Sequence, residues 1–189
     1  MAPKFNVLID ELPAGVYSGG VFYPIKTDFR NVFSYVRMLR DDTLSRQENT
    51  LMALVLFYGE TLPEDLSPLA QYLTWFINLG EETEASTGPR LFDLLGDSGR
   101  VYAAFRQVYR IDLRQARAHW WVFCELLEGL PNGTHLAEVI DIRGRKFEEW
   151  MKPSDRTALQ RLKDRYAIGG EQVDVITGLF ESLRGLAGG

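Results

Sequence analysis

Apolar residues recur every three or four positions along most of this chain, which is the spacing of one face of an α-helix. The clearest example follows Thr27 and Asp28, either of which can cap a helix that runs to about Arg40. Its apolar face contains Phe29, Val32, Phe33, Val36 and Leu39. The same signals predict further helices at about 45–59, 63–79, 97–109, 112–127, 134–142, 152–166 and 171–186. The pattern therefore predicts a mainly α, multi-helix domain of about seven to eight helices.

The N-terminal part has a different pattern. Two β-prone runs flank Ser18-Gly19-Gly20 between about residues 14 and 26. Glycine readily adopts the positive φ of tight hairpin turns, so we predict a small N-terminal β-hairpin there. Pro24 has no N–H to donate to a sheet and is expected at a strand end or edge. We divide the chain into a helical domain with this hairpin (1–168) and a C-terminal helical extension (169–189).

Short polar motifs mark several element ends. The segment 45–48, Ser-Arg-Gln-Glu, has the spacing of a capping box, in which the serine accepts from a free N–H and the glutamate reaches back. Asp112 is placed to cap the fifth helix, and Gly80 is a natural helix stop. The apolar face expected for that fifth helix comprises Leu113, Ala116, Trp120, Phe123 and Leu127. The polar, acidic segment 81–89 predicts a loop.

Composition narrows the class of protein. The 189 residues are 46% hydrophobic and carry a net charge of −5, whereas a dedicated nucleic-acid-binding protein is usually basic. The single cysteine, Cys124, excludes an intramolecular disulfide and points to the cytosol. The N-terminus lacks the apolar core of a signal peptide. The longest apolar stretches, 51–58 and 72–79, are too short to span a bilayer and are interpreted as buried helix, so no membrane association is expected.

Residues that could do chemistry are few and scattered. His119 and His135 fall on different predicted helices, and with one cysteine they do not make a zinc-binding pattern. A packed or capping role is favoured for His119, and Cys124 is expected to be a small buried hydrophobe. The loop 96–99 precedes a helix and fits either an anion site or, more simply, a loop with an N-cap. We expect no enzyme activity, no metal and no cofactor.

One segment is locally basic. Residues 143–165 contain eight basic and four acidic side chains, a net charge of +4. Such a segment can bind an anionic partner, either nucleic acid or an acidic protein surface. The residues that would form this patch are Arg143, Arg145, Lys146 and Arg156. The alternative, which we favour, is a solvated helix face with local ion pairs, for example Arg161 with Asp164.

Large aromatic and apolar side chains indicate protein–protein contact. Adjacent residues diverge on a helix, so either one of Trp120 and Trp121 reaches a partner, or both are buried in a multilayer helical domain. The helix predicted at 171–186 has one apolar stripe and can dock on its own domain or on another chain. The candidate partner-binding residues are Trp75, Trp120, Trp121, Phe180 and Leu183.

Several short motifs, taken in order, resemble one family. They are Tyr23-Pro24-Ile25-Lys26-Thr27-Asp28-Phe29-Arg30, Tyr102-Ala103-Ala104-Phe105, Tyr109, Ile111-Asp112-Leu113, His119-Trp120-Trp121-Val122-Phe123, Leu130-Pro131 and the basic stretch ending at Tyr166. Their order and spacing over about residues 5–168 are similar to those of the bacteriophage Gp15 proteins, which are encoded near the tail genes of many siphophages and prophages. The segment after Ile168 is longer than the family usually shows.

The resemblance implies a role in phage assembly. By analogy with siphophage gene order, such proteins are encoded where tail assembly chaperones are found. These are small helical proteins of the host bacterial cytoplasm that coat the tape-measure protein and recruit tail-tube subunits. The expected function is non-covalent binding of these two partners, with self-association as a further option and no catalytic residues. Two alternatives stay open: a structural tail-completion or connector component of the virion, and a nucleic-acid-binding phage protein that uses residues 143–165.

Overall fold

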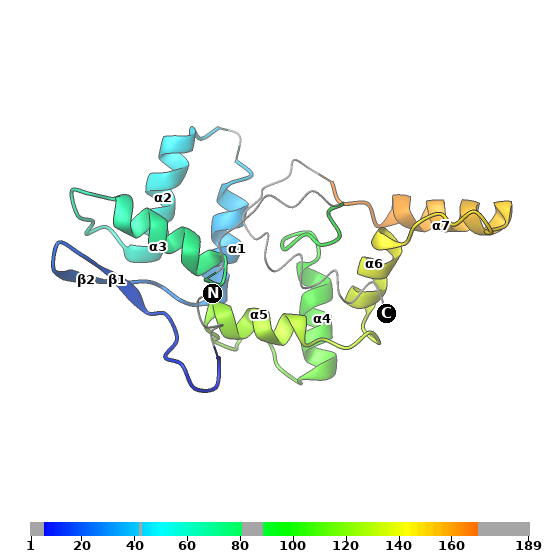
Figure 1. Cartoon of the computed structure of the whole chain (residues 1–189), viewed down its shortest axis with the longest axis horizontal. Coiled ribbons are helices and arrows are strands. Elements are labelled where there is room, and N and C mark those ends of the chain that lie inside the picture. The colour runs from blue at the N-terminus through cyan, green and yellow to red at the C-terminus, as the bar shows by residue number, and fades with distance from the viewer. Residues whose placement is uncertain (1–5, 42, 81–88, 170–189) are drawn as a thin grey trace.

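The computed structural model describes residues 6–41, 43–80 and 89–169, which form seven helices and a two-stranded hairpin (Figure 1). In chain order the elements are β1 (Gly15–Ser18), β2 (Val21–Pro24), α1 (Phe29–Met38), α2 (Arg46–Tyr58), α3 (Ser67–Ile77), α4 (Ser98–Val108), α5 (Trp120–Glu128), α6 (His135–Gly144) and α7 (Pro153–Arg165). The predicted mainly α fold with an N-terminal hairpin is confirmed. The helix predicted at 171–186 and nearly all of the loop predicted at 81–89 lie outside the described residues, and the division at residue 169 stays a prediction.

The hairpin has the turn that its glycines predict. β1 and β2 pair antiparallel, with Gly15 opposite Pro24. Gly19 and Gly20, between the strands, have φ values of 57° and 80°, a region that is strained for other residues and typical of two-residue hairpin turns. Pro24 ends β2, where its missing N–H does no harm. β1 packs against α3, which anchors the hairpin to the helices.

Two predicted helix starts have the expected caps. At α1, the Asp28 side chain accepts the Arg30 N–H at 3.0 Å. At α2, the Glu48 N–H donates to Ser45 Oγ at 3.3 Å, and the Ser45 N–H donates to Glu48 Oε2 at 2.8 Å. Both arrangements satisfy backbone N–H groups that have no partner inside the helix. The capping-box prediction is therefore confirmed.

The prediction that Asp112 caps the fifth helix is wrong. Asp112 begins only a single turn, and α5 starts at Trp120. The cap is His119, whose Nδ1 accepts the Trp121 N–H at 3.1 Å, which confirms a capping role for this histidine. The backbone before α5 cannot be helical because it pairs with the segment before α1, where the Trp120 N–H donates to Thr27 O at 2.7 Å.

α3 is shorter at both ends than the apolar pattern predicts. It begins at Ser67 rather than near residue 63, and its last helical residue is Ile77. Leu79 and Gly80 both have positive φ, 58° and 81°, so two residues rather than one turn the chain away from the helix. A side chain at Gly80 would also begin only 3.1 Å from the Trp121 ring, so the close approach of that ring favours glycine here.

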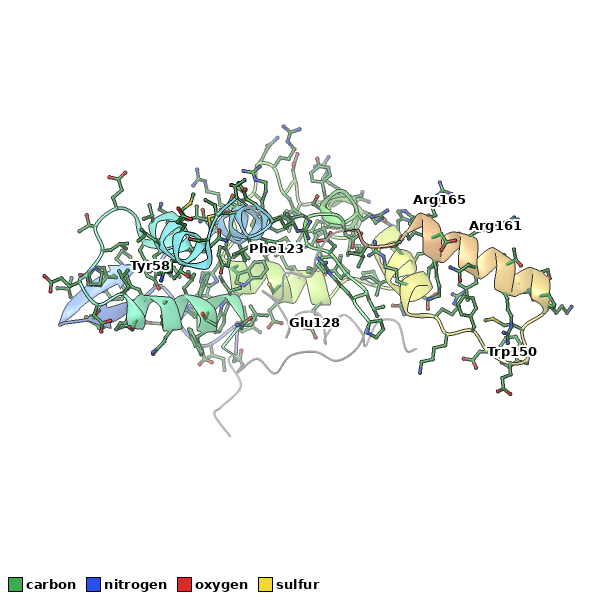
Figure 2. The ribbon with its side chains drawn as sticks, turned by 90° about the horizontal axis from the view of Figure 1, so that it is seen from above. Tyr58, Phe123, Glu128, Trp150, Arg161 and Arg165 are labelled. Carbon is green, nitrogen blue, oxygen red and sulfur yellow. The ribbon has the colours of Figure 1, made fainter. Side chains whose placement is uncertain are left out.

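The core joins α1, α4 and α5 through aromatic rings. Phe123 of α5 stacks on Phe29 of α1 at a centroid distance of 4.6 Å, and on Phe105 of α4 at 5.3 Å. Such ring pairs add to the stabilisation that apolar burial provides. α2 packs against α1 and α3, and α6 packs against α4. α7 packs against α6 and extends away from the body at one end of the molecule (Figures 1 and 2).

Candidate docking groove

α1 and α2 pack together and leave a groove on the surface, which we call the α1–α2 groove. Its volume is about 620 Å³. The residues that line it are Ser34, Arg37, Met38, Asp41, Leu44, Leu51, Met52, Val55 and Leu56. Because most of these side chains are apolar, the groove suits an apolar partner better than a polar small molecule.

The groove exists because the C-terminal part of α2 is apolar on all sides. Residues 51–57 are seven consecutive apolar residues, more than one helix face can hold. The side chains of α2 buried in the core are Ala53, Leu54 and Phe57. Those that stay exposed are Leu51 (49%), Met52 (46%) and Val55 (36%). The interpretation of 51–58 as a buried helix is therefore wrong for the outer face of α2, which is exposed. The sequence signal for this exposed apolar face was the unbroken run of apolar residues.

The groove is lined by adaptable methionine side chains and by side chains of both charges. Met38 and Met52 line it from the two helices, and the unbranched methionine side chain adjusts to differently shaped partners. Asp41 also lines the groove, and the Thr43 hydroxyl and N–H donate to Asp41 Oδ1 at 2.6 and 3.1 Å. These hydrogen bonds lower the pKa of the Asp41 carboxyl, so it is charged at neutral pH. Arg37 supplies the opposite charge among the lining residues.

Two of the predicted partner-binding tryptophans are buried. Trp120 is fully buried and Trp121 is 4% exposed. Their indole N–H groups donate to Ile77 O at 2.9 Å and to Phe76 O at 2.8 Å, so both close the last turn of α3. The prediction that these residues are offered to a partner is therefore wrong, and the alternative of burial within a multilayer domain is confirmed.

Trp75 is the exposed member of the same aromatic cluster. Its side chain is 39% exposed, and its ring lies 5.1 Å from that of Trp121. It stays a candidate contact residue, on α3 rather than in the α1–α2 groove. Phe180 and Leu183 lie outside the described residues.

The predicted basic patch does not form from its four residues. The Arg143 side chain is only 9% exposed and binds within the protein, so its assignment to an anionic partner is wrong. Arg145 pairs with Asp141 on α6, and Arg156 donates to a backbone carbonyl at 2.6 Å. Lys146 is exposed. The Arg145 contact is a local ion pair, which is the alternative that the charge pattern favoured.

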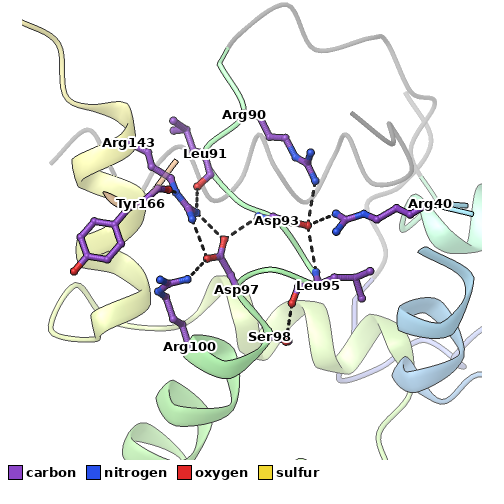
Figure 3. Close-up of polar contacts among 10 residues, drawn as sticks. All are labelled: Arg40, Arg90, Leu91, Asp93, Leu95, Asp97, Ser98, Arg100, Arg143 and Tyr166. Atoms are coloured by element: carbon purple, nitrogen blue, oxygen red, sulfur yellow. Dashed lines mark hydrogen bonds and ion pairs between the residues drawn. The ribbon is translucent and has the colours of Figure 1, made fainter. Parts of the chain in front are cut away.

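Arg143 instead belongs to a buried ion network (Figure 3). Asp97, which is fully buried, accepts from both terminal nitrogens of Arg143 at 2.6 and 3.0 Å and from Arg100 at 2.7 Å. Arg143 also donates to Leu91 O at 2.8 Å and to Tyr166 O at 2.6 Å. The guanidinium thus joins α6 to the start of α4 and to the end of α7, with its charge fully compensated.

The network continues to the far end of α1. The Asp93 N–H donates to Asp97 Oδ2 at 2.9 Å. The Asp93 carboxylate in turn accepts from Arg40, next to α1, and from Arg90 at 3.1 Å. The prediction for the loop 96–99 needs correction here. The Asp97 side chain makes no capping hydrogen bond to α4, because the two arginines occupy its carboxylate.

The residues considered for chemistry are occupied structurally. His119 Nδ1 accepts the Trp121 N–H, so Nε2 carries the proton and donates to Pro13 O at 2.9 Å. Burial lowers the pKa of His119, which favours this neutral ring. Cys124 is buried as expected, and burial raises the pKa of its thiol far above the ordinary value. Within the described ranges, no three His, Cys, Asp or Glu residues are grouped to hold a metal ion. No helix in the same ranges is long and apolar enough to cross a bilayer.

Comparison with known proteins identifies the family. No curated protein and no solved structure matches the chain significantly. The sequence pattern of the Bacteriophage Gp15 protein family matches residues 8–168, which include all seven described helices. This range agrees closely with the range over which the sequence motifs resemble that family. The chain therefore belongs to the bacteriophage Gp15 protein family, a family of phage structural or assembly proteins.

Proposed function

We propose that this protein is a phage tail assembly chaperone that holds an amphipathic helical segment of the tape-measure protein in the α1–α2 groove. Membership in the Gp15 family supports a role in building a phage particle. The groove supports reversible, non-covalent binding of an apolar partner. Recruitment of tail-tube subunits, self-association and action in the host bacterial cytoplasm belong to the same proposal.

The exposed apolar face of α2 is the observation that carries the proposal. Leu51 and Val55 are four residues apart and lie one above the other on the helix. Contiguous apolar surface of this kind marks interaction sites in water-exposed proteins. An amphipathic helix would lay its apolar stripe in the groove, with Arg37 and Asp41 beside its polar flanks. A tape-measure protein is a long amphipathic helical chain, so it offers many such stripes and aggregates when they are bare.

The test is co-expression with the tape-measure protein encoded nearest the gene, followed by affinity pull-down and measurement of the soluble tape-measure fraction. The wild-type protein is expected to co-purify with the tape-measure protein and to keep it in solution. Val55→Glu is expected to lose both effects, because it places a charge inside the groove. Leu162→Glu is the matched control: Leu162 on α7 is 37% exposed, against 36% for Val55, and the change in charge is the same.

Each other outcome points to a different conclusion. Equal capture by all three proteins would show that the groove is not the binding site. Failure of the wild-type protein to capture the tape-measure protein, with the protein found instead in purified particles, would favour the structural tail-completion or connector alternative. Salt-sensitive retention on DNA that is lost when Lys146 and Arg156 are changed to glutamine would favour the nucleic-acid alternative.

A further inference from the structure

Two exposed surfaces of opposite charge lie at the two ends of the molecule. We propose that these surfaces bind each other between two copies of the chain, so that the protein assembles head to tail. The inference rests on the proposed function only in that it gives self-association its two surfaces. The contact itself is argued from this chain alone, whether or not the tape-measure protein binds.

The first surface is formed by residues 145–166, which we call the α7 arm. The arm extends away from the body, and Trp150 lies near its outer end (Figure 2). Trp150 is 79% exposed, and Phe147 is 43% exposed. Tryptophan is enriched among the residues that dominate binding at protein interfaces. Trp150 is therefore suited to anchor a protein partner at this end of the molecule.

The α7 arm is basic. It contains seven basic and four acidic side chains, a net charge of +3. Arg145 pairs with Asp141 of α6. Lys146 and Lys152, which precede and follow Trp150 in the chain, are exposed, and neither forms a salt bridge with a described residue. The positive charge around Trp150 is therefore free to attract an acidic surface.

The second surface, which we call the hairpin end, combines the β-hairpin with the loop 59–66 that joins α2 to α3. Both lie at the end of the molecule opposite the α7 arm (Figures 1 and 2). Tyr17 and Phe22 face each other across the strands, with ring centroids 5.1 Å apart, and are 72% and 44% exposed. Val21, next to Phe22 in the chain, is 55% exposed. The hairpin end thus offers exposed aromatic surface on which a tryptophan ring can pack.

The loop at the hairpin end is acidic. Its charged side chains are Glu60, Glu64 and Asp65, which are all exposed and give a net charge of −3. The Ser67 N–H donates to Asp65 Oδ1 at 3.0 Å, and hydrogen bonding to Ser67 lowers the pKa of the Asp65 carboxyl. Every salt bridge among the described residues lies elsewhere. The loop therefore carries the uncompensated negative charge that the α7 arm requires.

The pairing of two different surfaces determines the kind of assembly. The α7 arm and the hairpin end match in charge, and each has exposed aromatic side chains. A contact between different patches is heterologous, and it continues from copy to copy unless a ring closes. Each added copy brings a free arm and a free hairpin end, because the two surfaces lie at opposite ends (Figure 1).

Charge reversal in the full-length protein tests the contact. The arm variant is Lys146→Glu with Lys152→Glu, and the hairpin-end variant is Glu60→Lys with Glu64→Lys. The measurement is the average mass by light scattering at rising protein concentration and low salt. The wild-type mass is expected to rise beyond that of a dimer, and each variant should associate more weakly, on the order of tenfold. An equal mixture of the two variants should regain the wild-type association, because each supplies the charge that the other needs.

The control changes the net charge as much as the arm variant does. Arg114→Glu with Arg117→Glu reverses two exposed charges before α5, away from both surfaces. This protein is expected to associate like the wild type. A loss of association equal to that of the arm variant would assign the effect to net charge and overturn the proposed contact.

Truncation of the anchor tests the apolar part of the contact. Trp150→Ala is expected to weaken association on the order of tenfold, also at higher salt, where charge contributes less. The circular dichroism spectrum should stay unchanged, because Trp150 is exposed. Unchanged association would overturn the role of Trp150 as the anchor.

Several results would overturn the head-to-tail assembly. They are a wild-type protein that stays monomeric, a mass that stops at the dimer, and a mixture of variants that associates no better than either variant alone. Retention of the monomeric protein on DNA, lost in the arm variant, would instead assign the α7 arm to nucleic acid. Because the mass measurement contains this protein alone, its outcome is independent of whether the tape-measure protein binds.

Discussion

At the scale of single residues, Asp97 and Arg143 dominate the electrostatics of the interior. Asp97 is fully buried, and a buried carboxylate is tolerated only when opposite charges and hydrogen bonds compensate it. Arg143 meets it with two nitrogens, and Arg100 with a third. The pair lies 46 residues apart in sequence and fixes α6 against the start of α4. We infer that this contact, rather than an anion-binding role, explains why a charged residue occupies position 143.

Replacing Asp97 tests this assignment. Asp97→Asn is expected to lower the free energy of unfolding by about 3–5 kcal/mol, because it leaves the buried Arg143 charge uncompensated. The control is Asp141→Asn, which removes a half-exposed ion pair with Arg145 and should cost less than about 1 kcal/mol. Urea unfolding followed by circular dichroism measures both values. A small and equal cost for the two variants would contradict the role given to Asp97.

His119 should make the stability of the fold sensitive to pH. Its pKa in the folded protein is lowered by burial, so the unfolded chain binds a proton more readily. The contribution of His119 to stability is therefore fully present above its unfolded pKa of about 6.5 and is lost as the pH falls below that value. Protonation of Nδ1 would also remove the acceptor for the Trp121 N–H at the start of α5.

The asparagine variant isolates this effect. Asn accepts at helix starts without titrating, so His119→Asn should keep the cap and reduce the loss of stability between about pH 7 and about pH 5.5. The measurement is the melting temperature at both pH values, with His135→Asn as the control at an exposed histidine. An undiminished loss in His119→Asn would assign the pH dependence to other groups.

Local residue roles could be predicted from the sequence, and long-range ones could not. Asp28 and Ser45 cap helices within three residues of themselves, so their motifs were sufficient. Asp97 looks like another N-cap, because nothing in its neighbourhood indicates that Arg143 competes for its carboxylate. His119 was correctly given a packed or capping role only by elimination, since it lacks metal-binding or catalytic companions.

At the scale of elements, α3 and α5 are joined through two indole groups. Trp120 donates to the carbonyl of Ile77, the last residue of α3, and Trp121 donates to that of Phe76, which also accepts from the Leu79 N–H at 3.3 Å. The contact explains how adjacent residues, which diverge on a helix, can both be buried: one helix end lies against two successive side chains. Their burial also removes them from any partner surface.

Two tryptophan-to-phenylalanine variants measure how much the indole contact contributes to stability. Trp120→Phe is expected to lower the free energy of unfolding by about 1–3 kcal/mol for the unsatisfied Ile77 carbonyl, with a further loss for the smaller ring. Trp150→Phe is the control, since Trp150 is 79% exposed, and it should change stability by less than about 0.5 kcal/mol. Equal effects in urea unfolding would mean that the indole hydrogen bond contributes nothing.

The observed element boundaries agree with the predicted ones where residues close by in the sequence determine them. The capping box of α2 and the hairpin glycines determine their own neighbourhoods, so both elements begin and turn where predicted. α5 begins late because its preceding residues pair with the segment before α1, a contact that helical periodicity cannot detect. The apolar run 51–57 predicted a helix correctly, but not which of its faces lacks cover.

At the scale of the whole molecule, an ordered helical body carries apolar surface that its described residues do not cover. The core is closed by aromatic stacking, and the buried ion network ties α6 to the segment after α1 through Asp97 and Asp93 (Figure 3). Against this background, the outer face of α2 is exposed on a helix that is otherwise firmly packed. A packed helical scaffold with an adaptable apolar groove is suited to holding a helical partner reversibly.

The residues of the candidate docking site could be predicted only in part from the sequence. Tryptophan content directed attention to α3 and α5, because aromatic residues are frequent at interfaces, but two of those side chains complete the core. The groove is formed by aliphatic and methionine side chains that look like ordinary core residues. Exposure depends on which helices pack on which faces, and that arrangement is a property of the whole fold.

The central claim is that the α1–α2 groove holds the tape-measure protein, and photo-crosslinking from position 55 tests it most directly. A benzophenone amino acid would replace Val55 in one protein and Leu162 in another, each co-expressed with the tape-measure protein and irradiated in cells. We predict crosslinks from position 55 to tape-measure residues spaced three or four apart, and none from position 162. No crosslink from position 55, or the same crosslinks from both positions, would contradict the account.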